Sequence, residues 1–169
     1  MHWVTSRKIK INRAATAWLI RRFIDPEAVL VFVSLGEVAA EARRLDGIGC
    51  HAPGTNYVAR DERSRTPFEA LVAERCPGDP ALRRMSEIVR DADVPRAGEV
   101  PEATGLRLIS GALPLVATDD AETVERSAFL YDAMYAALQH EAPIGRSSRK
   151  FSATIRLTGN QYGFHRALV

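Results

Sequence analysis

The sequence is poor in the features that mark several protein classes. It has only two cysteines, Cys50 and Cys76, which cannot make a disulfide framework and match no zinc-binding pattern. We therefore expect a reducing, cytoplasmic setting. No apolar run is long enough to cross a bilayer, and the N-terminus lacks the apolar core of a signal peptide. No repeat, glycine-rich phosphate loop, nucleophile elbow or zinc-protease motif occurs, so no standard enzyme class is indicated.

A large excess of one charge is also missing, because the net charge is only +2. Residues 1–25 hold six basic and one acidic side chain, and residues 141–169 hold five and one, so the region between them is acidic. We expect the basic ends to fold back on this acidic body. A nucleic-acid surface is the alternative, but single-strand binders interleave aromatic and basic side chains, and that pattern is missing. Neither nucleic acid nor a membrane is therefore an expected partner.

The pattern of apolar residues predicts an α+β protein that is mostly helical, with a single main domain over residues 1–140. Short β-favouring runs at residues 2–5 and 29–33 predict a small mixed or parallel sheet near the N-terminus. The second run, VLVFV, is continuously apolar, so we expect both of its faces to be covered. Capping and proline signals predict about six helices, at residues 12–25, 35–45, from 66, 79–93, 101–113 and 119–140.

The last part of the chain, residues 141–169, has a different character. A polar, basic linker is followed by apolar residues that alternate with polar ones from Phe151 to Thr158, which is the period of a β-strand. Gly159 and Asn160 would turn this strand into a short hairpin. A lone hairpin is marginal in water, so we expect this tail to pack on its own chain or on a partner subunit in a homodimer. A lid over a pocket is the alternative.

The stretch from Lys8 to Asp25, KIKINRAATAWLIRRFID, is the main candidate for a functional element. Its helix is apolar almost all round, which predicts burial, and Asn12 is expected to cap its first turn. A buried arginine needs an anionic or carbonyl partner. The exit arginines either pair with Asp25 or cap the last carbonyls of the helix, or one of them takes part in an anion pocket. The pocket would have Trp18 as its floor and basic walls made by Lys8, Lys10, Arg13 and one of Arg21 and Arg22.

This stretch also carries a resemblance to a known family. The run WVTSRKIKINRAATAWLIRRFIDPEA resembles the opening of the chromate-resistance domain, the C-terminal domain of ChrB proteins. The similarity extends over roughly residues 3–138, and the chain is identified as a divergent, stand-alone member. The resemblance implies a role in the stress response or in regulating chromate efflux. The matching residues near the start are Trp3, Val4, Thr5, Arg13, Trp18, Leu19, Ile20, Arg21, Arg22, Phe23, Ile24 and Asp25.

Four positions depart from the family pattern. Asn12 stands where the family usually has Asp, and Thr16 stands where it often has Cys. Asp61 and Thr66 lie in the segment where the family tends to carry a His and a Cys. If those family residues form a polar or metal site, this chain has altered it.

The glycine-rich loop at residues 47–65 is the least regular part of the sequence. Residues 55–59 are a possible strand. His51 is expected to be exposed, because a metal needs three or four ligands and no others recur nearby; a role as a base or ligand is the alternative. Asp91 or Asp93, at the end of the 79–93 helix, is expected to receive an arginine of the first helix, since an acid is unfavourable there without a basic partner.

Two tyrosines, Tyr131 and Tyr135, share the apolar face of the last helix, with Asp132 one step round. Buried phenols usually find a hydrogen-bond partner inside the protein. The alternative is that they reach a bound ligand.

Three functions remain open. The first is a protein that binds a small oxyanion or anionic metabolite, because arginines form paired hydrogen bonds to oxyanions; its site would contain Lys10, Arg13, Trp18, Arg21, Arg22 and Tyr135. The second is an enzyme on a recruited scaffold that acts on a small organic acid, with Asp61, Asp132 and Tyr131 as catalytic candidates. The third is a regulator that contacts DNA or a protein through its basic ends. The sequence identifies neither a cofactor nor a metal.

Overall fold

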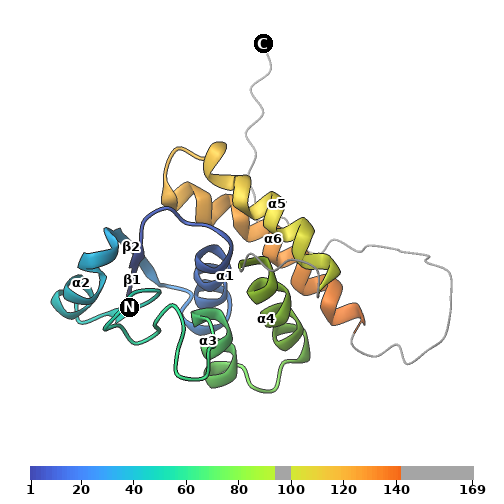
Figure 1. Cartoon of the computed structure of the whole chain (residues 1–169), viewed down its shortest axis with the longest axis horizontal. Helices are drawn as coiled ribbons and strands as arrows, with labels where there is room; N and C mark the ends of the chain where they lie inside the picture. Colours follow the sequence, from blue (N-terminus) through green and yellow to red (C-terminus); the bar gives the residue numbers. More distant parts are fainter. Residues whose placement is uncertain (94–99, 142–169) are drawn as a thin grey trace, which may run out of the picture.

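The computed structural model describes residues 1–93 and 100–141, which form a small parallel sheet beside a group of helices (Figure 1). Strand β1 (His2–Ser6) lies between β2 (Val29–Val33) and β3 (Ile48–Gly49), and both pairings are parallel. This confirms the prediction of an α+β fold with a small N-terminal sheet. Residues 141–169 lie outside the described residues apart from Glu141, so the predicted strand or hairpin and the boundary at residue 140 stay predictions.

Strand β2 is an edge strand, and the prediction that both of its faces are covered is confirmed only in part. Helix α1 (Ile11–Leu19) packs on one side of the sheet and α2 (Val38–Arg44) on the other. Leu30 and Phe32 pack against the core cluster that contains α1, and Val31 and Val33 pack against the smaller cluster that contains α2. Val29 is nevertheless 50% exposed, and the other four residues are only partly buried. A run of apolar residues cannot by itself distinguish a central strand from an edge strand of so small a sheet.

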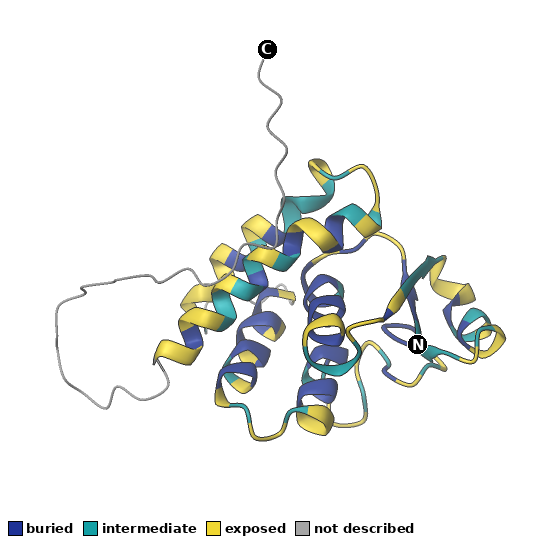
Figure 2. Cartoon of the chain, turned by 180° about the vertical axis from the view of Figure 1, so that it is seen from behind, coloured by how far each residue is buried: buried dark blue, intermediate teal, exposed yellow. Residues whose placement is uncertain are grey.

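Helix α1 is the centre of the helical part. It packs against α3 (Pro67–Arg75), α4 (Pro80–Asp93), α5 (Pro101–Ala112) and α6 (Asp120–Glu141). All of its residues except Arg13 are buried, as the continuous dark band in Figure 2 shows. The predicted burial of this helix is confirmed.

The start of α1 differs from the prediction, whereas the helical stretch ends at Asp25 as predicted. Lys10 precedes the first turn, and Asn12 lies inside the helix with a buried side chain, so Asn12 is not the cap. After Leu19 the helix widens into a π-helical turn, η1 (Ile20–Ile24), closed by a 2.7 Å hydrogen bond from the Asp25 N–H to the Ile20 carbonyl. The Asp25 carboxylate pairs with the N-terminal amine of Met1 at 3.1 Å and accepts a bond from the Trp3 indole at 3.1 Å, not from the exit arginines.

The predicted helix caps at Thr66, Asp79 and Asp119 are confirmed. Thr66 accepts the Glu69 N–H at 3.3 Å while Glu69 accepts the Thr66 N–H at 2.8 Å, a reciprocal cap that fixes the start of α3. Asp79 and Asp119 cap the first turns of α4 and α6 by accepting the Leu82 and Glu122 N–H groups at 2.9 and 2.8 Å. Short 3-10 turns, η2 (Leu35–Glu37) and η3 (Leu113–Leu115), precede α2 and follow α5.

The possible strand at residues 55–59 does not form, and this segment makes only a single β-bridge, between Cys50 and Tyr57. Among the described helices, none has the length and apolar character that crossing a membrane requires.

Candidate functional site

The connection between β1 and α1 is a candidate binding region. Strand β1 ends at Ser6 and α1 begins at Ile11, so the carboxyl end of a parallel strand feeds directly into a helix N-terminus. Ligands of parallel α/β units bind at the carboxyl ends of the strands, and helix N-termini attract negative charge. Because β3 is parallel to β1, the loop that follows β3 begins at the same edge of the sheet, and Cys50 and His51 are its first residues.

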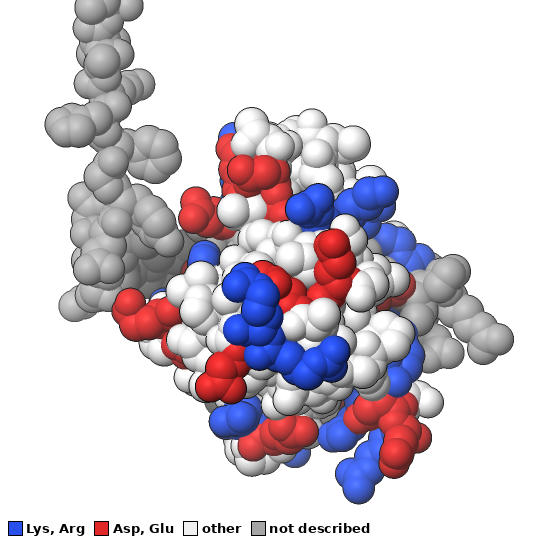
Figure 3. All heavy atoms as spheres, turned by 90° about the vertical axis from the view of Figure 1, so that its left-hand side faces the viewer, with Lys and Arg blue, Asp and Glu red and all other residues white. Residues whose placement is uncertain are grey.

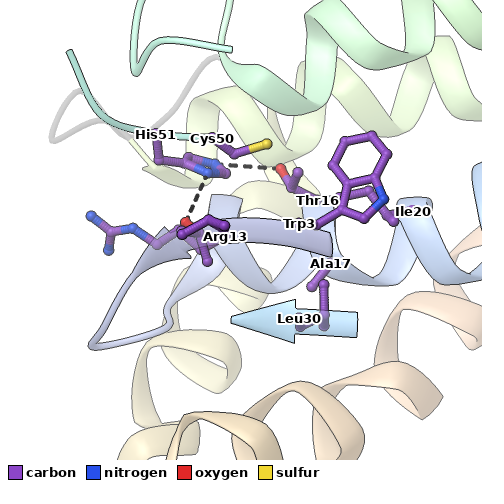
Figure 4. Close-up of a pocket in the computed structure, with 10 residues that line it drawn as sticks. Trp3, Arg13, Thr16, Ala17, Ile20, Leu30, Cys50 and His51 are labelled. Atoms are coloured by element: carbon purple, nitrogen blue, oxygen red, sulfur yellow. Dashed lines mark hydrogen bonds between the residues drawn. The ribbon is translucent and has the colours of Figure 1, made fainter. Parts of the chain in front are cut away.

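A cluster of buried polar side chains lies under this connection, and His51 is its centre (Figure 4). The His51 Nε2 atom lies 3.0 Å from Asn12 Oδ1 and 3.4 Å from Thr16 Oγ1. On the other side of the ring, Nδ1 lies 3.4 Å from Thr5 Oγ1. The strand β1, the helix α1 and the loop after β3 are therefore joined by one imidazole. We call these four residues, Thr5, Asn12, Thr16 and His51, the polar cluster.

The prediction that His51 is exposed was wrong, because its side chain is only 7% exposed. Its backbone has φ of 63°, the left-handed region that non-glycine residues seldom adopt, and this turn directs the ring inward. Burial, with a smaller contribution from the charge of Arg13, lowers the pKa of His51 from 6.5 to about 3. The imidazole is therefore neutral at physiological pH.

The cavity beside the polar cluster is small. Its volume is about 10 Å³, close to the minimum for one water molecule. Its lining includes Thr5, Thr16 and His51 of the cluster together with Trp3, Arg13, Ile20, Leu30 and Cys50. Burial raises the pKa of the Cys50 thiol to about 12, so this group is a protonated thiol and not a nucleophilic thiolate. An oxyanion of several atoms does not fit this cavity and would have to bind at its outer side.

Arg13 forms that outer side. Figure 4 shows its guanidinium on the side of the cluster away from Trp3 and Ile20. Its Nη1 donates to the Lys8 carbonyl at 3.2 Å, which holds the side chain against the β1–α1 connection. Its Nε–H is buried and has no acceptor among the described residues.

The unsatisfied buried donors are concentrated here. Within the described part of the chain, three buried side-chain polar atoms lack a partner: Ser6 Oγ, Asn12 Nδ2 and Arg13 Nε. All three can donate a hydrogen bond, and all lie between positions 6 and 13. Buried donors without acceptors are costly, so such a concentration indicates a place for an acceptor from outside the described chain.

The end of α4 adds a carboxylate to this region. Although part of its side chain still reaches solvent, partial burial raises the pKa of Asp93, against the lowering influence of Arg60, Arg13, the Asn12 N–H and Arg107. Asp93 is therefore the acid that faces an arginine of the first helix. Its neighbour Asp91 instead accepts the Val100 N–H at 3.1 Å.

The exit arginines lie in a different place. Trp18, Arg21, Arg22 and Asp132 line a groove of about 340 Å³ between the end of α1 and α6. Asp132 accepts the Trp18 indole N–H at 3.0 Å and lies 3.5 Å from Arg22 Nε. Glu125 also lines the groove, so its two arginines face two carboxylates.

The structure therefore does not bring the predicted basic residues into one pocket. Arg13 lies in the first turn of α1 and Arg22 in η1, the π-helical turn that continues it, roughly 13 Å apart along the axis at about 1.5 Å per residue. Lys10 is exposed at the Arg13 end, while Trp18 is buried at the other. The prediction of a single pocket required the two ends of the same helix to converge, which a straight helix cannot do.

The remaining candidates are engaged inside the protein. Tyr131 is fully buried, and its hydroxyl bonds to the Ile11 carbonyl and to Ser110 Oγ at 2.8 and 3.0 Å. Tyr135 donates to Asp79 Oδ2 at 2.6 Å, and burial with this acidic neighbour raises the pKa of Tyr135 to about 12. Asp61 pairs with Arg65 at 2.7 Å in the loop that precedes α3.

The predicted catalytic residues thus share no hollow among the described residues. Asp61 lines a hollow with Arg65 and Glu74, Asp132 lines the groove beside α6, and Tyr131 lines neither. In the same part of the chain, no three His, Cys, Asp or Glu side chains gather closely enough to hold a metal ion.

The polar cluster is a feature that was not predicted from the sequence. A signal was present, because Asn12 and Thr16 are four residues apart on one helix face and are two of the positions that depart from the family pattern. The structure places both against His51. Thr66, a third such position, caps α3, and Asp61 fixes its loop through the Arg65 backbone and side chain.

Comparison with known proteins places this scaffold in a family. The profile described as ChrB, C-terminal domain, matches residues 3–138, which is most of the chain. The chain therefore belongs to the ChrB C-terminal domain family, and the resemblance found in the sequence is confirmed. A relative is Protein ChrB of Cupriavidus metallidurans, which is 29% identical over 137 residues. That match covers 79% of this chain but only 39% of the relative, and no solved structure matches the chain.

Proposed function

We propose that this chain is a chromate-resistance-type stress or regulatory protein that binds a small oxyanion or an anionic metabolite at the β1–α1 connection. The observation that carries the proposal is the pair of buried donors without acceptors on consecutive residues, Asn12 Nδ2 and Arg13 Nε. Family membership supports the chromate-resistance context. Arg13 is the principal ligand in this proposal, with Lys10 as a nearby exposed cation.

The charges of the two candidate places favour the β1–α1 connection over the groove. The N-terminus of α1 carries the positive end of the helix dipole, and Lys8, Lys10 and Arg13 add three positive charges close to it in the sequence. Two carboxylates, those of Asp93 and Asp120, also lie there, so the basic side chains outnumber the acidic ones by one. In the groove, Arg21 and Arg22 lie at the negative end of the same helix and face Glu125 and Asp132. A tetrahedral oxyanion is therefore better accommodated by Arg13 than by Arg22.

Thermal unfolding of the full chain with increasing chromate, sulfate and phosphate tests this proposal. A ligand that binds the folded state alone raises the stability by about 2.7 kcal/mol at one hundred times its Kd. We expect stabilisation in at least one series, and its loss in Arg13→Gln. The matched control is Arg22→Gln, which removes the same charge from the other end of α1 and should keep the effect.

Absence of stabilisation by all three anions contradicts oxyanion binding. Loss of the effect in Arg22→Gln but not in Arg13→Gln contradicts the assignment to the β1–α1 connection.

The other two functions receive less support from the described residues. The proposed catalytic residues do not meet, as described above, so no geometry carries the enzyme alternative. Figure 3 shows acidic and basic side chains interspersed over one face of the protein, without the single-sign surface that a nucleic-acid partner favours. We therefore do not propose a reaction or a nucleic-acid partner.

A further inference from the structure

A carboxylate of the chain itself is bound at the β1–α1 connection. The Ile9 N–H donates to Asp120 Oδ1 at 2.7 Å, and the Lys8 N–H donates to Asp120 Oδ2 at 3.0 Å. Asp120 is the first residue of α6 and is separated from Ile9 by 111 positions in the sequence. Two oxygens of one anion thus take two consecutive backbone donors, which is how a small oxyanion is bound.

The backbone around Lys8 has the shape of an anion site. Lys8 has φ of 65°, although it is not a glycine, and consecutive N–H groups around such a residue converge on a shallow concavity that accepts anions. This concavity lies between the end of β1 and the start of α1. We call the two donors, the Lys8 and Ile9 N–H groups, the cradle.

No cation balances Asp120 directly. Within the described chain, no charged side-chain nitrogen of Lys or Arg lies within 4 Å of its carboxylate. The side chains of Lys8 and Lys10, close by in the sequence, are exposed and pair with no acid in the same part of the chain. The region therefore keeps positive charge in excess even with Asp120 bound.

Arg13 connects the cradle to the proposed site. Its Nη1 donates to the carbonyl of Lys8, the same residue whose N–H donates to Asp120. An oxyanion that replaced the carboxylate would lie close to the two cradle donors and to the Arg13 guanidinium, all of which belong to residues 8–13. The unsatisfied Nε–H of Arg13 and the Asn12 amide lie on the helix turn that follows.

We propose that Asp120 is an internal competitor that occupies the oxyanion cradle, and that a bound oxyanion takes over the Lys8 and Ile9 donors while Asp120 leaves them. This inference rests on the proposed function, because it concerns regulation of the same site. Two anions cannot share two donors, so the carboxylate weakens oxyanion binding and the oxyanion weakens the attachment of α6 to the β1–α1 connection. Asp120 therefore sets the anion concentration at which the site fills.

The variant Asp120→Asn tests the exchange in the full chain, because it removes the charge and keeps a side chain of the same shape. The matched control is Asp119→Asn, one residue earlier. Asp119 caps α6 by accepting the Glu122 N–H at 2.8 Å and makes no contact with the cradle, and asparagine caps equally well. With sulfate as the probe, calorimetry should show binding about tenfold tighter in Asp120→Asn and less than twofold tighter in Asp119→Asn.

A second measurement needs no variant. In the wild-type chain, sulfate should shift the amide NMR resonances of Lys8 and Ile9, because these N–H groups change acceptor. Equal gains in affinity in the two variants would mean that only the overall charge matters, and would overturn the exchange. Unmoved Lys8 and Ile9 amides at saturating sulfate would overturn it as well.

These outcomes separate the two proposals. If wild type binds sulfate, Arg13→Gln does not, and Asp120→Asn binds no tighter than wild type, then the oxyanion site stands and the exchange fails. If sulfate, phosphate and chromate all fail to bind and to stabilise both wild type and Asp120→Asn, both proposals fail together.

Discussion

Tyr131 donates a hydrogen bond to the backbone carbonyl of Ile11 at 2.8 Å, across 120 residues of sequence. Tyr131 lies in the middle of α6, and Ile11 is the first residue of α1. Together with the contact of Asp120 to the cradle, this bond fixes the start of α1 against α6. The position of the β1–α1 connection is therefore set by the helix most distant from it in the sequence.

Replacing Tyr131 by Phe should destabilise the protein by about 1–2 kcal/mol. The substitution removes one hydroxyl and leaves the Ile11 carbonyl without this buried partner. Urea unfolding monitored by circular dichroism would measure the change. A loss below about 0.5 kcal/mol would show that the bond contributes little to the attachment of the two helices.

The polar cluster should make the stability depend on pH. The unfolded chain protonates His51 near its ordinary pKa of 6.5, while burial keeps the folded pKa at about 3. The unfolded state therefore binds more protons between these values, and folding stability is present above pH 6.5 and falls as the pH is lowered. From pH 7 to pH 5 we expect His51 to account for a loss of about 2 kcal/mol.

The comparison that isolates this effect is between wild type and His51→Asn. Asparagine tolerates the left-handed backbone conformation of position 51 and does not titrate. The free energy of unfolding of the variant should fall about 2 kcal/mol less between pH 7 and pH 5. Parallel curves for the two proteins would show that His51 is protonated without cost, contrary to its buried position.

Arg22 and Asp132, which pair in the groove beside α6, should contribute unequally to the stability of the protein. Arg22→Gln removes one side of an exposed ion pair, which is worth at most about 1 kcal/mol. Asp132→Ala also removes the acceptor of the buried Trp18 indole N–H, and an unpaired buried donor costs about 1–3 kcal/mol. Chemical denaturation should therefore rank Asp132→Ala as clearly the less stable. A reversed order would contradict the structural role given to Asp132.

Thr66 should matter as a helix cap. Thr66→Ala removes the acceptor of the Glu69 N–H and should cost about 1 kcal/mol, while Thr66→Ser keeps the hydroxyl and should cost much less. Thermal unfolding of both variants would measure the difference. Equal losses would mean that the methyl group of Thr66, and not its hydroxyl, stabilises this end of α3.

Much of the fold could be predicted because its signals are local. Thr66 with Glu69, and Asp79 with the proline that follows it, fix helix starts through contacts within one turn, and these predictions are confirmed. The burial of α1 followed from its apolar periodicity. Family membership followed from the Trp18 to Asp25 block, which is a specific pattern.

The site could not be predicted in the same way, because it is built from contacts between distant segments. His51 looked exposed since its loop is rich in glycine, and only the left-handed turn after β3 directs it to Asn12 and Thr16. Asn12 looked like a cap since its residue type favours that position. The positive charges at the two ends of α1 looked like one site, although the length of the helix separates them.

Chromate offers the most direct test of the central claim, because chromium scatters X-rays anomalously. In crystals of the full chain soaked with chromate, the account predicts an anomalous peak at the β1–α1 connection, with chromate oxygens within hydrogen-bonding distance of the Arg13 guanidinium. A peak confined to the groove of Arg21 and Arg22, or no peak at a soak concentration well above the measured Kd, would contradict it.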